Sequence, residues 1–446
     1  MTEAAGLQPS QPGALTHRRV LKIALPIVLS NATVPLLGAV DTGVIGHLGR
    51  AAPIGAVGVG SVILATFYWV FGFLRMGTSG LTAQATGAGD EAEAGAILLR
   101  ALAIGAGAGL LFVLIQPAIF ALAFAVSPAS DEVETLARSY LAIRIWGAPA
   151  TISLYAVTGW LIARERTRGV LAVQLWMNGL NMGLDFLFVL GLGWGVKGVA
   201  TATLIAEWSG LALGLWLCRQ AFAEGRWRDL ARIVDAGKLR RMASVNGDIM
   251  LRSILLQGAF TSFVFLGARF GDVTLAANQV LLQFLEITAF ALDGFAFAAE
   301  SLVGQAVGQR SQAMFRQAAV LTSQWGAGGA VLLCAVFLVL GPQLIDLLTT
   351  EPQVRAAARG WLAWVAVMPV LGIACWMLDG IFIGATRTRD MRNSMVLTMI
   401  AYLPVLFLLP RLVGNSGLWA ALGLLMILRG ITLGRLYPQI ERNLPA

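Results

Sequence analysis

The chain has 446 residues, of which 57% are hydrophobic and only 13% are charged. Soluble domains carry about 25% charged residues, so the composition excludes a water-soluble enzyme, a disordered chain and a coiled coil. It indicates an integral membrane protein instead. At ~20–25 residues for each transmembrane helix, the chain has room for about twelve helices.

The net charge of +8 does not indicate nucleic-acid binding, because the basic residues lie in short segments between hydrophobic runs. Most of the 32 Lys and Arg residues fall on one side if the amino terminus is placed in the cytoplasm. This excess predicts an inner-membrane protein with both termini in the cytoplasm. Cys218, Cys334 and Cys375 lie in three separate hydrophobic runs, and we interpret them as buried thiols.

Long, continuous hydrophobic runs predict helices rather than the short alternating strands of a membrane barrel. The segment 1–16 is polar, and the run after it is too long for a cleavable signal, so we expect that run to remain as the first helix. Six runs lie near residues 20–45, 54–79, 95–125, 134–160, 169–193 and 196–222. Six more lie near 243–268, 275–300, 315–345, 355–383, 393–412 and 416–437. The predicted fold class is therefore all-α integral membrane, with twelve transmembrane helices.

The two halves of the sequence repeat each other. LTAQATG at 81–87 recurs as LVGQAVG at 302–308, and TGWLIARERTR at 158–168 recurs as DGIFIGATRTR at 379–389, both at the same offset along the chain. The second half begins after six helices, so both halves start on the same side of the membrane. This predicts two six-helix lobes related by a pseudo-twofold axis along the membrane normal, with a cavity between them.

We place the boundaries where hydrophobicity changes. The predicted parts are a polar tail at 1–17, an amino-terminal lobe at 18–222, a basic cytoplasmic linker at 223–242, a carboxy-terminal lobe at 243–437 and a tail at 438–446. We interpret the linker sequence RWRDLARIVDAGKLRR (226–241) as a positive-inside connector, with binding of anionic lipids as the alternative.

Two acidic residues of the first lobe are the main candidates for a functional site, because a carboxylate at membrane depth costs several kcal/mol. Asp41 ends a run without other ionisable groups, and Asp185 shares one helical face with Asn181 and Asn178. If the first and fifth helices meet, one of the two carboxyl groups should hold a proton. The same oxygens, with a hydroxyl such as that of Thr203, could bind Na⁺ instead. The structural alternative is that the acids only cap or brace helices.

The second half lacks this pair, because Ser262 and Leu406 stand at the corresponding positions. Ion chemistry is therefore predicted in the first lobe. Acids of the second lobe, Glu286 and Asp379, are candidates for attracting a cationic substrate. The residues that we expect to line the substrate cavity are Glu286, Asp379, Thr158 and Asn178.

Other polar and proline residues inside the runs have two interpretations each. Arg75 either reaches the inner headgroups or pairs with a buried acid such as Glu300. Glu286 and Asp293 are seven residues apart and share a helical face. Pro26 and Pro35 each remove a helical hydrogen bond in the first helix, and this gives either a bend that responds to Asp41 or a static kink.

Four motifs carry a resemblance to a known family: DTGVIGHLG at 41–49, FLRMGTSGLTAQATG at 73–87, ERTR with NGLNMGLD between 165 and 185, and ALDGFAFAAESLVGQAVG at 291–308. With these motifs the sequence resembles the multidrug and toxic compound extrusion (MATE) family, in its DinF (DNA-damage-inducible F) branch. The resemblance implies two lobes that form a V and open alternately to each side. It also implies export of organic, often cationic or amphipathic, compounds in exchange for H⁺ or Na⁺.

The resemblance assigns roles to individual residues. It implies a cation-coupling site of Asp41, Asn181, Asp185 and Thr203, with Thr201 as the near alternative to Thr203. It also implies that Pro26 is the proline at which the first helix bends. Thr158 stands where some members have an Asn in the fourth helix.

We therefore predict a monomeric inner-membrane antiporter that exchanges small organic substrates for H⁺ or Na⁺ and needs no cofactor. It is not expected to be an enzyme, because the sequence has no Walker A, HExxH or hydrolase motif. Membrane lipids are its expected surroundings, and no nucleic acid is expected as a partner. The alternatives are a flippase for lipid-linked precursors of the same superfamily, a membrane-embedded enzyme, and a receptor or scaffold.

Overall fold

The computed structural model describes residues 15–47, 50–126 and 130–445, and the regular structure in these ranges is helical. The first half contains α1 (His17–Ala32), α2 (Val34–Gly46), α3 (Ala51–Trp69), α4 (Gly72–Gly87), α5 (Glu91–Leu114), α6 (Gln116–Val126), α7 (Asp131–Arg144), α8 (Ala148–Ala163), α9 (Thr167–Asp185) and α10 (Gly195–Leu217). The second half contains α12 (Ala236–Gly267), α13 (Asp272–Gly308), α14 (Gln312–Leu348), α15 (Pro352–Gly384), α16 (Thr388–Val413) and α17 (Asn415–Arg442). Short elements are η1 (Ile145–Gly147), the π-helix η2 (Phe186–Gly191), η3 (Arg219–Arg228), α11 (Leu230–Ile233) and η4 (Ala268–Phe270).

Twelve membrane crossings fit this chain, as predicted. Within the described residues, ten helical segments are long and apolar enough to cross a membrane. The other two crossings are α1 with α2 and α9 with η2, and each of them is broken into shorter pieces. α12 begins inside the predicted linker, after Asp235 has capped its first turn by accepting a hydrogen bond from Lys238 N at 2.8 Å. α17 extends to Arg442, into the predicted carboxy-terminal tail.

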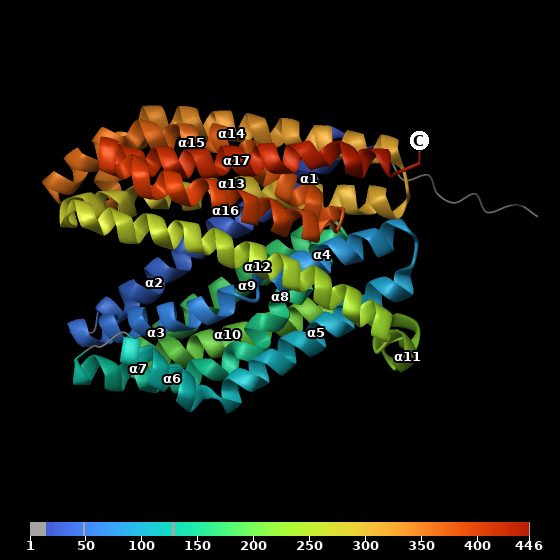
Figure 1. The fold of residues 1–446 in the computed structure, drawn as a ribbon. Coiled ribbons are helices and arrows are strands. Elements are labelled where there is room, and N and C mark those ends of the chain that lie inside the picture. The colour runs from blue at the N-terminus through green and yellow to red at the C-terminus, as the bar shows by residue number, and fades with distance from the viewer. Residues whose placement is uncertain (1–14, 48–49, 127–129, 446) are drawn as a thin grey trace, which may run out of the picture.

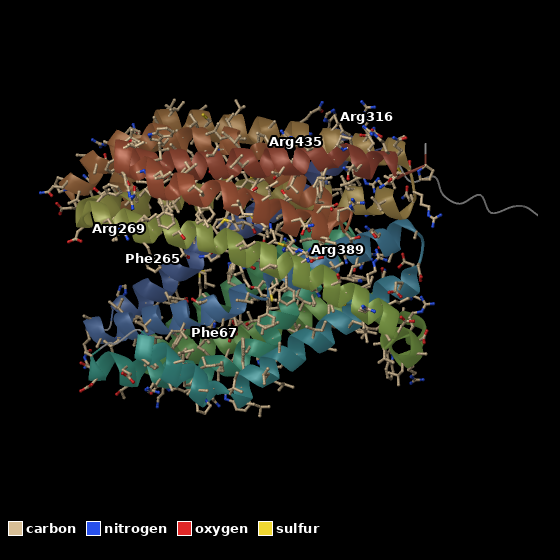
Figure 2. The ribbon with its side chains drawn as sticks, in the orientation of Figure 1. Phe67, Phe265, Arg269, Arg316, Arg389 and Arg435 are labelled. Atoms are coloured by element: carbon tan, nitrogen blue, oxygen red, sulfur yellow. The ribbon has the colours of Figure 1, made fainter. Side chains whose placement is uncertain are left out.

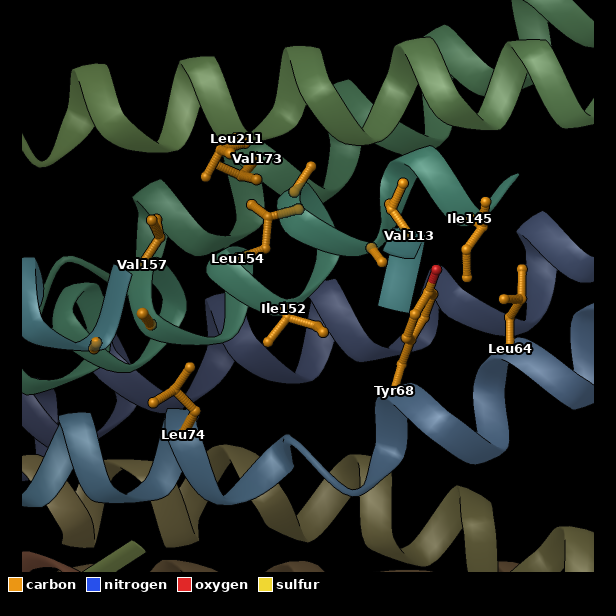
Figure 3. Close-up of a cluster of buried hydrophobic side chains, with 14 of the residues drawn as sticks. Leu64, Tyr68, Leu74, Val113, Ile145, Ile152, Leu154, Val157, Val173 and Leu211 are labelled. Carbon is orange, nitrogen blue, oxygen red and sulfur yellow. The ribbon is translucent and has the colours of Figure 1, made fainter. Parts of the chain in front are cut away.

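The helices form two layers (Figure 1). One layer holds α3 and α5–α10, coloured blue to green, and the other holds α13–α17, coloured gold to red. The layers are apart on the left of the view and meet on the right, where α4 packs against α12 and α13. Each layer has its own hydrophobic core. In the first core, Tyr68 of α3 points toward Val113 and Ile145 (Figure 3).

The first membrane crossing belongs to both lobes. A third hydrophobic cluster packs Val20, Ile23 and Ile27 of α1 against α13, α14 and α15 of the second lobe. Val44 and Ile45 of α2 lie in the core of the first lobe. The chain therefore passes from one lobe to the other where α1 ends and α2 begins.

The sequence repeat recurs in the backbone. Glu165 after α8 and Thr386 after α15 stand at equivalent positions of the two halves, and both are non-glycine residues with positive φ, at 56° and 51°. Each helix end is closed by an equivalent hydrogen bond, from Arg166 N to Leu161 O at 2.8 Å and from Arg387 N to Phe382 O at 2.9 Å. Left-handed residues at helix ends satisfy carbonyls that would otherwise lack partners. The two halves thus share turn geometry as well as helix order.

Glycines bring the lobes together at the joined end. A Cβ at Gly87 would lie 2.1 Å from Gln305 O, and a Cβ at Gly308 would lie 2.1 Å from Gln84 O. Small residues let helix backbones approach closely inside a membrane. Arg316, Arg389 and Arg435 lie in the half of the molecule that contains this end and α11, whereas Arg269 lies at the opposite end (Figure 2). By the excess of basic residues, the joined end is the one that we predict to be cytoplasmic.

Candidate functional site

The site is built on one face of α9. Asn178, Asn181 and Asp185 are three and four residues apart, so a helix directs them to one side. Their exposed fractions are 2%, 1% and 0%. Polar groups buried this deeply need partners, and α1, α2 and α10 supply them.

Asn181 lies between the two predicted acids. With its amide oriented to match its neighbours, its nitrogen donates to Asp185 Oδ2 at 3.1 Å and to Asp41 Oδ1 at 3.1 Å. Its oxygen then accepts from Thr203 Oγ1 at 3.0 Å and from the Thr203 backbone nitrogen at 3.2 Å. Three helices, α2, α9 and α10, therefore meet at one amide. The structure brings together all four residues predicted for the coupling site. Of the two candidate threonines, Thr203 contacts Asn181, whereas the Thr201 hydroxyl donates to Lys197 O.

The Asp41 and Asp185 carboxyl groups both lie within hydrogen-bond distance of the same amide nitrogen, so the two acids are close neighbours. Two carboxylates this close repel each other in a medium of low dielectric constant, and a proton or another small cation on the pair relieves this repulsion. Asp185 Oδ1 is buried and has no hydrogen-bond partner among the described residues. This pair can therefore bind a small cation, with a proton as the simplest. No group of three or more His, Cys, Asp or Glu side chains forms a metal site in the described ranges.

The two acids lie on crossings that are broken into shorter helices, α1 with α2 and α9 with η2. Directly after Asp185 the helix changes to the π-helix η2, a form that is rare in proteins and frequent at functional sites. Asp41 lies on α2, which begins with Pro35 near its first position. A proline there is compatible with a new helix because its missing N–H has no helical partner to lose.

The break in the first crossing is held by α9. Asn178 Nδ2 donates to Thr33 Oγ1 at 2.9 Å and to Thr33 O at 3.2 Å, and Thr33 is the residue between α1 and α2. α1 itself continues through Pro26, so the observed break lies seven residues after the proline that we predicted as the bend. Bending at Pro26 stays a prediction. The Asn178 amide is directed toward the break and is not among the lining residues of the cavity described next, so its place in a substrate cavity stays a prediction.

A cavity of about 880 Å³ lies between the lobes. Trp69, Arg75 and Tyr155 line it from the first lobe, and residues of α12, α13, α15 and α17 line it from the second. Glu286 and Asp379, both predicted for the substrate cavity, are among its lining residues, whereas Thr158 of α8 is not. Asn31 Nδ2 at the end of α1 donates to Phe290 O in the cavity wall at 3.1 Å.

The two cavity acids differ in their surroundings. Asp379 Oδ2 accepts hydrogen bonds from Arg252 and from Arg429, the latter at 2.5 Å. Two guanidinium groups thus compensate its charge, while Glu286 has no ion-pair partner among the described residues. The role of Glu286 in attracting a cation stays a prediction. The sequence shows these arginines inside apolar runs, but it does not show that they meet at one carboxylate.

Arg75 pairs with Glu300, as one of its two interpretations predicted. Arg75 Nη1 donates to Glu300 Oε2 at 3.1 Å and Arg75 Nη2 donates to Oε1 at 3.3 Å, so the pair is bidentate. Arg75 is on α4 of the first lobe and Glu300 is on α13 of the second. The pair therefore connects the lobes.

Comparison with known proteins agrees with this architecture. The MatE family profile matches residues 26–187 and 249–408. DNA damage-inducible protein F of Escherichia coli (strain K12) is 40% identical over 422 residues, which cover 94% of this chain and 92% of that protein. The probable multidrug resistance protein NorM of Xanthomonas axonopodis pv. citri (strain 306) is 28% identical over 490 residues, which cover 100% of this chain and 99% of that protein.

Solved structures show the same fold. The crystal structure of the Vibrio cholerae MATE transporter VcmN in the bent form matches with a TM-score of 0.83 at 21% identity, covering 96% of this chain and 97% of that chain. A MOP superfamily transporter from Pyrococcus furiosus matches with a TM-score of 0.82 at 19% identity, covering 96% of both chains. Because the family match and the 40% identical relative each cover most of the sequence, this chain belongs to the MatE family and resembles its DNA-damage-inducible F branch.

Proposed function

We propose that this chain is a secondary active efflux transporter, which exports small amphipathic organic cations across the inner membrane in exchange for H⁺ or Na⁺. The observation that carries the proposal is the Asn181 amide between the Asp41 and Asp185 carboxyl groups, inside two membrane crossings that are each broken into shorter helices. Relatives named as multidrug resistance proteins support the substrate class. We further propose that the chain acts as a monomer with both termini in the cytoplasm, without a cofactor and not as an enzyme.

The mechanism follows from the charge of the carboxyl pair. One proton allows the Asp41 and Asp185 carboxyl groups to share a hydrogen bond, whereas two carboxylates this close repel each other in a medium of low dielectric constant. Loss of the proton therefore separates α2 from α9. Asn178 lies on the same face of α9 and is hydrogen-bonded to Thr33, so a movement of α9 also displaces the break between α1 and α2. α1 transmits it to the cavity wall through the Asn31–Phe290 hydrogen bond, and bending at Pro26 would enlarge it.

The choice of coupling ion depends on the orientation of one amide. With its nitrogen toward the acids, Asn181 donates two hydrogen bonds to a pair of carboxyl groups that share a proton. A rotated amide would direct its oxygen toward the same carboxyl groups, and oxygen ligands are what Na⁺ requires, as for other hard cations. The first orientation satisfies every polar atom of the amide, and we therefore favour the proton.

A flippase for lipid-linked precursors is the second candidate, and it would need a cavity with free positive charge for a phosphate. The cavity does contain Arg75, Arg252 and Arg429. Each of these arginines is paired with a carboxylate, however, while Glu286 has no such partner in the described part of the chain. The charge of the cavity favours the export of cations.

Substitution of the two acids tests the proposal. Asp41→Asn and Asp185→Asn should each abolish efflux of a dye cation driven by a proton or Na⁺ gradient in everted vesicles, with normal amounts of protein in the membrane. Asp272→Asn is the matched control, because Asp272 is exposed in the first turn of α13 and far along the sequence from the site. Wild-type efflux by the Asp41→Asn variant would reject the coupling scheme.

A further inference from the structure

The Arg75 side chain occupies a site with the chemistry of an organic-cation receptor. Its guanidinium carbon lies 3.9 Å from the centroid of the Phe297 ring, and its nitrogens donate to both oxygens of Glu300. An aromatic face next to a carboxylate is a recurring way to bind organic cations. Phe297 and Glu300 are three residues apart on α13, and both line the cavity.

The cation in this site comes from the opposite lobe. Arg75 is 9% exposed and Glu300 is 1% exposed, so each group is largely shielded from water and depends on the other for its hydrogen bonds. The α4 backbone at Arg75 is fixed within the first lobe, since a Cβ at Gly159 of α8 would lie 2.3 Å from Arg75 O. When the lobes separate at this end, Arg75 must therefore leave with the first lobe, and Glu300 remains on α13.

The other two arginines of the cavity are not positioned to take the place of Arg75 at Glu300. Arg252 and Arg429 both donate to Asp379 on the wall made by α12, α15 and α17. Asp293 and Glu286 are further acids on α13, one and two steps of seven residues from Glu300. They extend a line of carboxyl groups from Glu300 along the cavity face of one helix.

We propose that Arg75 is a built-in competitor of the transported cation. It fills the site of Phe297 and Glu300 while the lobes are joined at the predicted cytoplasmic end, and it leaves this site when they separate there. A substrate cation and Arg75 exclude each other at Glu300, so substrate binds well when the cavity opens to the cytoplasm. Return of Arg75 displaces it toward Asp293 and Glu286. This inference rests on the proposed function and adds how substrate affinity changes between the two states.

Binding of ethidium, an organic cation, to the purified protein in nanodiscs tests this competition. In Arg75→Gln the competitor is gone, so we expect ethidium to bind about tenfold more tightly than to the wild type, a typical coupling between two sites. Arg75→Lys keeps the positive charge and should keep the weak wild-type binding. Glu300→Gln in the Arg75→Gln background should remove the gain.

The matched control is Arg100→Gln, because Arg100 is a buried arginine that pairs with Glu93 at 2.8 Å within the first lobe. It should leave ethidium affinity unchanged. Phe297→Leu is a second variant and does not itself alter a buried charge. It should weaken binding to the Arg75→Lys protein less than to the Arg75→Gln protein.

Three results would contradict the proposal that Arg75 competes with the transported cation. These are unchanged affinity in Arg75→Gln, a gain that survives Glu300→Gln, and an equal gain in Arg100→Gln. If the wild type exports ethidium and any of these results is found, the proposed function stands and only this inference fails. If the wild type neither binds nor exports organic cations, both fail together.

Discussion

At the scale of single residues, the coupling site depends on an uncharged side chain as much as on the two acids. The Asn181 amide is 1% exposed and makes four hydrogen bonds to three different residues. A buried donor that loses its partner costs about 1–3 kcal/mol. Any change of charge at Asp41 or Asp185 therefore changes the hydrogen bonding of the whole group.

Two threonines on α10 allow a matched test of this group. Thr203→Val removes the hydroxyl that bonds to Asn181, and at about 1 kcal/mol per hydrogen bond we expect roughly fivefold slower proton-driven efflux. Thr201→Val removes a hydroxyl that bonds only to the backbone of its own helix, and we expect wild-type efflux. Initial rates of dye efflux in everted vesicles measure both variants. Equal effects of the two substitutions would contradict the assignment of Thr203.

Much of this site was predictable from residue spacing. Asn178, Asn181 and Asp185 share a face because a helix has a fixed period, and Asp41 is a lone acid in an apolar run. Pro35 pointed to a break in this crossing, but the contact between Asn178 and Thr33 at the break was not predictable, because the two residues are far apart in the sequence. The pairing of Asp379 with Arg252 and Arg429 depends likewise on three helices that are distant in the sequence.

At the scale of elements, the two broken crossings form one unit. α9 contacts the first crossing in two places. Asn178 bonds to Thr33 at the break, and Asn181 bonds to Asp41 on α2. The hydrophobic run 20–45 predicts one crossing, and Pro35 within it predicts a break in helical hydrogen bonding. The structure places the break two residues before this proline, at Thr33.

Removal of the Asn178 contact should separate ion binding from transport. In Asn178→Leu the Asp41–Asn181–Asp185 group remains, so proton release on adding substrate should persist while efflux falls by about tenfold. Hydrogen exchange of the Thr33 and Val34 amides should become faster, because the break loses two hydrogen bonds. Normal efflux together with faster exchange would show that the break does not couple the site to the cavity.

At the scale of the whole molecule, the two halves hold each other at the predicted cytoplasmic end. Gln84 Nε2 of the first lobe donates to Gly384 O at 3.0 Å and to Thr386 Oγ1 at 3.0 Å in the second. Gln305 Nε2 of the second lobe donates to Ala163 O at 3.1 Å in the first. Gln84 and Gln305 occupy equivalent positions of the sequence repeat, and so do Ala163 and Gly384. The contact between the lobes therefore repeats the symmetry of the sequence.

This symmetry predicts that equivalent substitutions act in the same direction. Gln84→Leu and Gln305→Leu should each shift the protein toward the state open at this end, by about fivefold for each hydrogen bond lost between the lobes. The shift should be larger for Gln84→Leu, which loses two such bonds, than for Gln305→Leu, which loses one. Distances between spin labels on the two lobes measure the populations. A shift caused by one substitution and not by the other would show that the two contacts differ in strength.

Close packing at the same end gives a second test. Gly87→Val places side-chain atoms against Gln305 O, so the lobes should no longer join at this end and efflux should stop. Gly107→Val is the matched control, because nothing lies within 4 Å of a Cβ at this position on α5. We expect the control to retain wild-type efflux. Efflux by Gly87→Val at the wild-type rate would mean that closure here is not needed for transport.

The path of the first crossing changes where a lobe is considered to begin. α1 lies in a hydrophobic cluster with α13, α14 and α15, although it precedes the first lobe in the sequence. A chimaera that joins one half of this protein to the other half of a relative should therefore be cut at Thr33 as well as at the basic connector. Cutting at the connector alone would separate α1 from the partner helices against which its side chains are fitted.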